Sequence, residues 1–131
     1  MYNTLDDGDI LLLKKYDKTY SRNEIIVFNY QESRLVKRVI GLPGENVSYK
    51  NGKLYINNEE VIDNFSSITH DFELSQLGFY IIPEGYYFVM GDNRGNSLDS
   101  RDFRVGLIKK ENIVGNTIFR LFPFNKIGTI K

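Results

Sequence analysis

A lysine inside an apolar run is the first residue of this chain that could do chemistry. Lys37 lies among Val36, Val39 and Ile40, β-branched residues that favour a strand with alternate side chains facing the interior. Removal from water disfavours the ammonium form, so the pKa of a buried lysine falls and its amine can act as a base near neutral pH. Such an amine can deprotonate a serine hydroxyl, the Ser/Lys form of nucleophilic catalysis. The alternative, which this segment alone favours, is that Lys37 and Arg38 are surface cations at a strand edge.

The second segment of interest is Gly91–Arg101, a polar loop that follows a strongly apolar strand. A polar loop of this length must satisfy its own backbone through side chains, which Asp, Asn and Ser do well. Loops on rigid strand scaffolds are also where function concentrates. The alternative is structural: Asp99 and Arg101 could pair with Arg94 and Asp92 in an ion network that only rigidifies the loop, and its serines would then be ordinary loop hydroxyls.

Short strands are the elements that must hold these residues, because apolar residues occur in β-branched or aromatic bursts between polar turns. Asn51-Gly52 predicts a type I′ hairpin, and Asn57-Asn58 predicts a second one that returns along Glu60–Asp63. Only Phe72–Leu77 and Ile108–Asn112 could hold a helical turn, and neither sustains a helical period. The predicted strands are Ile10–Leu13, Glu24–Phe28, Leu35–Ile40, Val47–Lys50, Lys53–Ile56, Tyr86–Met90 and Ile113–Leu121. We therefore expect one all-β domain over residues 1–131, an antiparallel and partly closed barrel or sandwich with little helix.

Composition excludes several classes of function. The 131 residues include 17 basic and 17 acidic side chains, and this balance argues against a nucleic-acid partner. There is no cysteine and only one histidine, His70, so neither a thiolate nucleophile nor a Cys- or His-rich metal site is expected. No run approaches the roughly 18 apolar residues that a membrane span needs, and Met1–Asp9 has no basic segment typical of a signal peptide.

Taken together, the segments resemble the type I signal peptidases, membrane-anchored serine endopeptidases that remove signal peptides from exported proteins. Lys37–Glu45 is similar to the family's K-R-V-I-G-L-P-G-D/E box, and Gly91–Arg101 matches its G-D-N-R-x-N-S-x-D-S-R box at every fixed position. Arg22–Phe28 resembles the preceding R-G-D-I-V-V-F box, with Asn and Glu replacing Gly and Asp. Asn51–Asn57 is similar to the hairpin that usually follows. The short spacing between the boxes resembles the compact members typical of Gram-positive bacteria.

The resemblance implies a role for each matching residue. Lys37 is the implied general base, and Ser97 hydrogen-bonds and orients its amine. Asp99 and Arg101 form a salt bridge that fixes the loop carrying Ser97. The implied supporting residues are Arg38, Asp92, Asn93 and Arg94. No metal or organic cofactor is implied, because the Ser/Lys mechanism needs none, and His70 is not expected to be catalytic.

The resemblance also implies how substrate is held and how the chain begins. Leu35 and Val36 would line an edge strand to which the extended substrate adds by main-chain pairing, with shallow pockets for the small side chains of the A-x-A pattern. Met1–Leu5 is similar to the family's S-M-x-P-T-L segment without its serine, and Met1 and Leu5 are expected to contact substrate. The nucleophile would then directly precede Met1, with a single membrane anchor further upstream and the domain on the extracytoplasmic face. A chain beginning at Met1 should be proteolytically inactive.

Two other functions compete with peptide cleavage. Asn3 replaces the family's proline, which favours a signal-peptidase-like protein that holds pilin subunits during pilus assembly without cutting them; Lys37 and Ser97 oppose this. A self-cleaving repressor-type peptidase shares the Ser/Lys chemistry but would need a DNA-binding segment. Aromatic residues are expected to fill the core, and some to form an apolar rim that rests on the membrane surface: Tyr80, Tyr86, Tyr87, Phe88, Phe119, Phe122 and Phe124.

Overall fold

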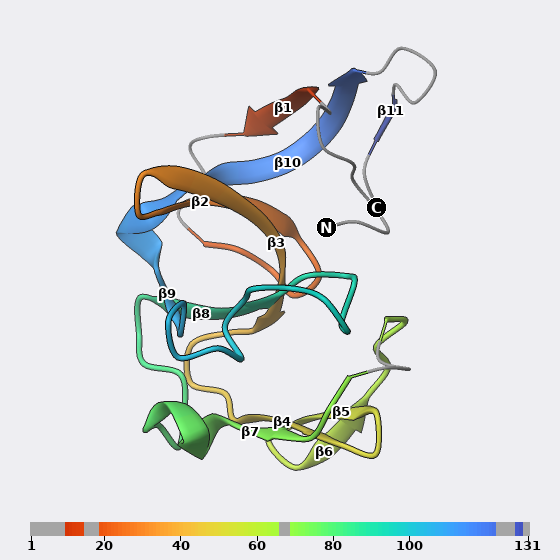
Figure 1. Ribbon diagram of the computed structural model, residues 1–131, viewed down its shortest axis with the longest axis vertical. Helices are drawn as coiled ribbons and strands as arrows, with labels where there is room; N and C mark the ends of the chain where they lie inside the picture. The colour runs from red at the N-terminus through yellow and green to blue at the C-terminus, as the bar shows by residue number, and fades with distance from the viewer. Residues whose placement is uncertain (1–9, 15–18, 66–68, 123–127, 130–131) are drawn as a thin grey trace.

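Two antiparallel sheets make up the fold (Figure 1) in the computed structural model, which describes residues 10–14, 19–65, 69–122 and 128–129. The larger, seven-stranded sheet has the order β1-β10-β2-β3-β8-β9, with β11 paired to β10, and the smaller one has the order β6-β5-β4-β7. The larger sheet comprises β1 (Ile10–Lys14), β2 (Ile25–Tyr30), β3 (Ser33–Gly41), β8 (Tyr86–Met90), β9 (Ile108–Lys109), β10 (Ile113–Phe122) and β11 (Gly128–Thr129). The smaller sheet comprises β4 (Val47–Lys50), β5 (Lys53–Ile56), β6 (Glu59–Val61) and β7 (Phe72–Glu73).

Two tight turns made of asparagine and glycine build the smaller sheet. Asn51 and Gly52 have φ of 54° and 75°, and Asn57 and Asn58 have φ of 53° and 68°. Two successive residues with positive φ are the signature of a type I′ turn, whose twist matches that of the flanking strands. Both predicted hairpins are thereby confirmed, and they place β4, β5 and β6 side by side.

The core lies on both faces of the larger sheet because successive side chains of a strand point to opposite faces. On β3, Ile40 packs into the cluster shared with the smaller sheet, whereas Val39 packs into the cluster on the other face. On β8, Phe88 and Met90 belong to the first cluster and Val89 to the second. The central strands are therefore apolar on both faces. The loop that follows β8 begins where the two sheets pack together.

The first half of β3 has one open edge among the described residues. β2 pairs with β3 along its length from Ser33 to Arg38, whereas β8 pairs only with the end of β3 from Arg38 to Gly41. The backbone of Val39 faces β2, where it exchanges hydrogen bonds with Glu24 and Asn23. Because backbone groups alternate along a strand, those of Val36 and Arg34 face the open edge.

The structure confirms the all-β prediction and all seven predicted strands to within a few residues. The two segments expected to hold a helical turn contain the 3₁₀ helices η2 (Leu74–Leu77) and η3 (Lys110–Asn112), and each helix is preceded by a two-residue strand. Tyr80, one of the aromatic residues expected in the core or its exposed rim, is 87% exposed and lies in the irregular segment between η2 and β8. Tyr87 and Phe88 are buried as predicted. The side chains of Phe119, Phe122 and Phe124 lie outside the described residues.

No helix within the described ranges is long and apolar enough to cross a membrane.

Gly41, at the end of β3, is packed closely against both sheets. A Cβ there would lie 2.6 Å from Ile82 Cδ1, 2.6 Å from Val47 Cγ2 and 3.1 Å from Phe88 Cβ. We expect Gly41→Ala to lower the free energy of unfolding by about 1–3 kcal/mol through overpacking, as measured by urea denaturation. Gly95→Ala, at an exposed glycine without positive φ, should change it by less than about 0.5 kcal/mol. Equal effects would show that the junction is loosely packed.

Candidate active site

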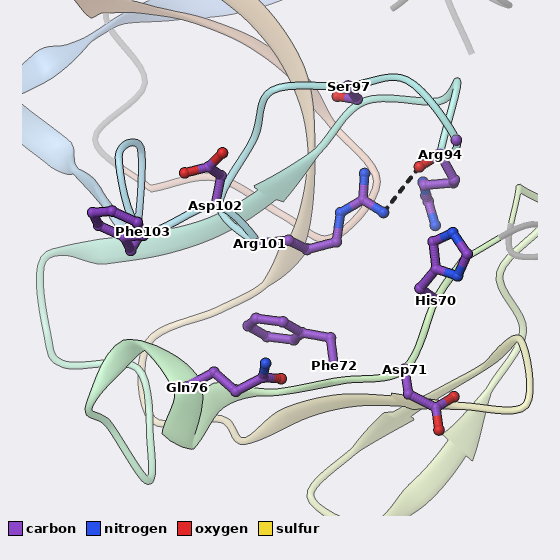
Figure 2. Close-up of a pocket in the computed structure, with 10 residues that line it drawn as sticks. His70, Asp71, Phe72, Gln76, Arg94, Ser97, Arg101, Asp102 and Phe103 are labelled. Atoms are coloured by element: carbon purple, nitrogen blue, oxygen red, sulfur yellow. Dashed lines mark hydrogen bonds between the residues drawn. The ribbon is translucent and has the colours of Figure 1, made fainter.

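The polar loop that follows β8 lines one side of a cavity of about 470 Å³, and residues at β7 and η2 line another. Figure 2 shows Ser97 and Arg101 on the loop side of this cavity, with Phe72 of β7 and His70, which precedes β7, opposite them. His70 is exposed. The carboxylate of the neighbouring Asp71 accepts a hydrogen bond from the backbone N–H of Asn51 rather than serving a catalytic pair. Of the residues that line this cavity, Arg94, Ser97 and Arg101 also belong to the site described next.

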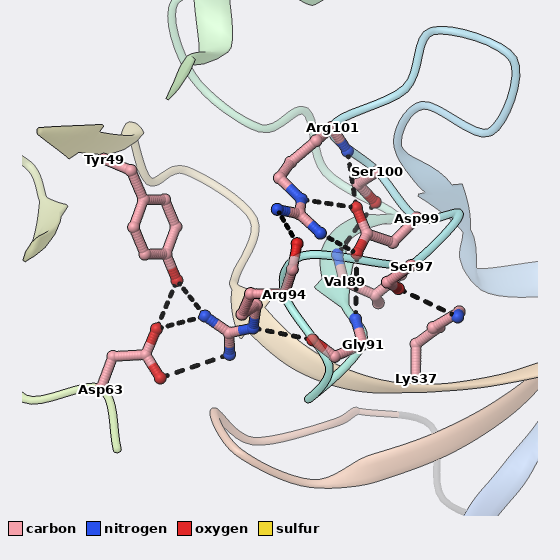
Figure 3. Close-up of polar contacts among 10 residues, drawn as sticks. All are labelled: Lys37, Tyr49, Asp63, Val89, Gly91, Arg94, Ser97, Asp99, Ser100 and Arg101. Carbon is pink, nitrogen blue, oxygen red and sulfur yellow. Dashed lines mark hydrogen bonds and ion pairs between the residues drawn. The ribbon is translucent and has the colours of Figure 1, made fainter. Parts of the chain in front are cut away.

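Lys37 and Ser97 are in direct contact although 60 positions separate them. The Lys37 Nζ donates a hydrogen bond to the Ser97 Oγ at 3.1 Å (Figure 3). Only 8% of Lys37 is exposed, and Ser97 is half-buried. The structure thus shows the contact that the resemblance implied, and it excludes the alternative in which Lys37 is a solvated surface cation.

Burial changes the protonation of Lys37. Desolvation is the largest influence and holds the pKa of the Lys37 amine below the ordinary lysine value, because the charged form loses its hydration. Among charged groups, Asp99 acts to raise this pKa, Arg101 to lower it and Asp92 to raise it. A lysine with a lowered pKa is partly neutral at a pH where an exposed lysine is not, so this amine is better able to accept a proton.

Gly91 makes the contact between Lys37 and Ser97 possible. A Cβ at this position would lie 2.2 Å from the Ser97 Oγ and 3.4 Å from the Lys37 Nζ, so a side chain larger than hydrogen would displace the serine. The backbone of Gly91 is also fixed: its N–H donates to Asp99 at 3.0 Å and its carbonyl accepts from the Arg94 Nε at 2.7 Å.

Asp99 organises the loop around this glycine. Its carboxylate accepts hydrogen bonds from the Gly91 N–H and, at 2.9 Å each, from the Nε and one terminal nitrogen of Arg101. The other terminal nitrogen of Arg101 donates to the carbonyl of Arg94. Ser100 anchors the loop to β8, because its Oγ accepts from the Val89 N–H at 2.9 Å. The implied Asp99–Arg101 salt bridge is therefore present, and it fixes the segment that carries Ser97.

The other ions of the loop pair differently from the structural alternative, which joined Asp99 and Arg101 to Arg94 and Asp92. Asp92 instead forms a buried two-bond ion pair with Arg38 of β3, both bonds at 2.9 Å. Arg94 pairs at 2.5 Å with Asp63, which follows β6 of the smaller sheet. That prediction was wrong because both partners are distant in sequence, and local spacing favours near neighbours.

The remaining predicted site residues are placed as follows. Asn93 is half-buried, and its carbonyl accepts from the Asn96 N–H in a turn of the loop. Leu35 and Val36 are half-buried on the open half of β3. Met1 and Leu5 lie outside the described residues. In the described part of the chain, no group of three or more acidic, His or Cys side chains could hold a metal ion.

Two residues at the site were missed by sequence reasoning. Asp63 pairs with Arg94, and the Phe65 ring lies against the guanidinium groups of Arg38 and Arg94. Both follow β6, in a stretch treated only as the end of a hairpin. No spacing marks them, since their partners are set by how the two sheets pack.

Comparison with known proteins agrees with this geometry. The family model described as signal peptidase, peptidase S26, matches residues 1–122. The chain therefore belongs to the signal peptidase family.

Its similarity to individual members is distributed over the whole chain. It is 41% identical to signal peptidase I T of Bacillus subtilis (strain 168), over 100% of this chain and 74% of that protein. It is 42% identical to signal peptidase I V of the same organism, over 88% of this chain and 76% of that protein. A crystal structure of a signal peptidase I from Enterococcus faecalis V583 matches with a TM-score of 0.66 and 38% identity, covering 75% of this chain and 96% of that one.

The lowered pKa of Lys37 predicts a dependence of stability on pH. Between this pKa and the ordinary value near 10.5, the unfolded chain binds more protons than the folded chain, so the free energy of unfolding contributed by Lys37 rises with pH. We expect the wild-type chain to gain stability relative to Lys37→Met as pH increases through this window, as measured by urea denaturation at a series of pH values. A difference that stays constant with pH would mean that the amine is hydrated in the folded chain.

Proposed function

We propose that this chain is the catalytic domain of a signal peptidase I that cleaves signal peptides from exported pre-proteins by a Ser/Lys mechanism. The observation that carries the proposal is the hydrogen bond between the buried Lys37 Nζ and the Ser97 Oγ. A buried lysine in contact with a hydroxyl is the arrangement expected of a general base held in position by a third group. Relatives named signal peptidase I support the substrate class.

The proposed chemistry uses Lys37 twice. The neutral amine takes the proton from the hydroxyl of the nucleophilic serine, which the family resemblance puts directly before Met1, as the serine oxygen attacks the scissile carbonyl. The tetrahedral species then expels the amine of the mature chain, which receives the proton from the Lys37 ammonium. Lys37 next deprotonates a water molecule that attacks the acyl-enzyme. The ester bond to the serine then breaks, the serine oxygen takes the proton back from the Lys37 ammonium, and the signal peptide leaves with a carboxylate end. Ser97 accepts a hydrogen bond from the amine throughout and keeps it aimed at the reacting oxygen.

The open half of β3 is the proposed binding edge for the signal peptide. The backbone groups of Val36 and Arg34 face this edge, and it ends beside Lys37. An extended peptide could pair with it as an added strand, which supplies affinity through the main chain. Met1 and Leu5 are proposed to contact the same peptide, and a membrane anchor upstream would hold the domain on the extracytoplasmic face of the cell membrane.

This mode of binding predicts an alternating response to backbone methylation. In a peptide ending in Ala-x-Ala, N-methylation of the residues whose N–H groups face β3 should abolish binding to this chain. Methylation of the residues between them, whose N–H groups face away from β3, should leave the affinity nearly unchanged. Calorimetry measures the affinity, and the amide signal of Val36 reports the site. Equal loss for both sets of methylated peptides would argue against strand addition.

Substitution of the base tests the proposal most directly. In the full-length gene product, we expect Lys37→Ala to reduce pre-protein cleavage by at least about a hundredfold, because general-base catalysis typically contributes that much. Mass spectrometry of the released chains measures the reaction. Lys53→Ala is the matched control, since Lys53 is an exposed lysine of β5, and it should leave cleavage unchanged.

The same experiment separates cleavage from the alternative role in pilus assembly. Unchanged turnover in Lys37→Ala would remove Lys37 as the base. If the wild-type gene product binds a pilin segment at the β3 edge but cuts no pre-protein, the assembly role is favoured instead. The intact Lys37–Ser97 contact favours the enzyme, because a protein that only holds a segment has no need of a lowered lysine pKa.

A further inference from the structure

We propose that Asp63 and Phe65, which follow the last hairpin strand of the smaller sheet, are positioning residues for the Lys37–Ser97 pair. Neither touches that pair. They act through Arg94 and Arg38, whose guanidinium groups they hold from the side of the smaller sheet. The inference rests on the proposed function, since it assigns these residues to the geometry of the same site.

Asp63 is the anion that fixes Arg94. Its carboxylate bonds the Arg94 guanidinium at 2.5 and 3.3 Å and accepts a third bond from the Tyr49 hydroxyl at 2.6 Å. The Asp63 side chain is only 5% exposed and that of Arg94 is fully buried. Burial acts to raise the pKa of Asp63, but the bonds from Arg94 and Tyr49 outweigh it and hold that pKa below its usual range. Asp63 therefore remains an anion that confines Arg94 to one geometry.

Arg94 passes this constraint to Gly91. Its Nε donates to the Gly91 carbonyl at 2.7 Å, while Asp99 holds the Gly91 N–H on the other side of the residue. Gly91 is the residue packed directly against the Ser97 Oγ and the Lys37 Nζ. An unbroken series of bonds thus runs from the smaller sheet through Asp63 and Arg94 to the backbone that contacts the pair, as Figure 3 shows.

Phe65 adds a second link to the site. The centre of its ring lies 5.0 Å from the Arg38 Cζ and 5.8 Å from the Arg94 Cζ, distances typical of cation–π contact. Asp63 also fixes the backbone that carries this ring, because its carboxylate accepts the Phe65 N–H at 3.1 Å. Arg38 directly follows Lys37 on β3, so one aromatic ring contacts both the neighbour of Lys37 and the arginine bonded to Gly91.

Replacing Asp63 by the isosteric asparagine tests this role in the chain as it stands. Without the anion, Arg94 is held less tightly, Gly91 and Ser97 can move away, and water can reach the amine. We expect the pKa of Lys37, followed by NMR of its Nζ and Cε in Asp63→Asn, to rise toward the ordinary lysine value. A merely electrostatic role predicts the opposite sign, since loss of a negative charge favours the neutral amine. The charges that act on Lys37 are those of Asp99, Arg101 and Asp92.

Two further variants complete the design. Phe65→Leu keeps an apolar side chain and every charge, and it should also raise the pKa of Lys37. Glu60→Gln is the matched control, because Glu60 is an exposed carboxylate of the same sheet, 3.9 Å from Lys53, and it should have no effect. The ring signals of Phe88 confirm that each variant is folded.

The outcomes separate this inference from the proposed function. An unchanged or lowered Lys37 pKa in folded Asp63→Asn and Phe65→Leu would overturn the positioning role even if Lys37→Ala abolishes cleavage. A raised pKa supports the positioning role whether or not the pair cuts pre-proteins, because the measurement needs no turnover. If only Asp63→Asn raises it, the role belongs to the Arg94 ion pair and the part assigned to Phe65 is wrong.

Discussion

A lysine amine held out of water against a serine hydroxyl is the interaction on which the other contacts of the site depend. Such an amine must lie close to its partner and yet have no anion in direct contact, or its pKa would return to the ordinary range. The acid with the greatest charge effect on Lys37 is Asp99, and its carboxylate is already bonded by Arg101 and the Gly91 N–H. Asp99 therefore shapes the loop without binding the amine. The carboxylate of Asp92 is likewise engaged by another cation, Arg38.

The buried ion pairs around the site specify geometry more than they add stability. Desolvating two charges offsets most of their attraction, so a buried pair is weak evidence for stability, whereas removal of one partner costs about 3–5 kcal/mol. Arg38–Asp92 joins β3 to the start of the loop, and Arg94–Asp63 joins the loop to the smaller sheet. Arg101–Asp99 adds a third ion pair inside the loop. An alternative loop conformation would leave at least one of these charges buried and unpaired.

How much of the fold and of the site could be predicted from the sequence depends on how far apart in the sequence the contacting residues are. The hairpins at Asn51 and Asn57 follow from local turn chemistry, and the strands follow from the spacing of β-branched and aromatic residues. The contact between Lys37 and Ser97 could be predicted only from the family resemblance, because no spacing rule joins a strand residue to a loop residue 60 positions away. The partner of Arg94 was predicted wrongly for the same reason. Asp63 and Phe65 have no local signature, since their function arises only when the two sheets pack.

This dependence on long-range contacts also determines when the site can form. The Lys37–Ser97 bond closes a separation of 60 positions, and the Arg94–Asp63 bond one of 31. Contacts of this kind form only after the entropy of closing long loops has been overcome by other interactions. The cluster that packs Ile40 and Phe88 against the smaller sheet supplies those interactions. The burial of Lys37 therefore depends on the packing of the core between the two sheets as well as on the contacts within the loop.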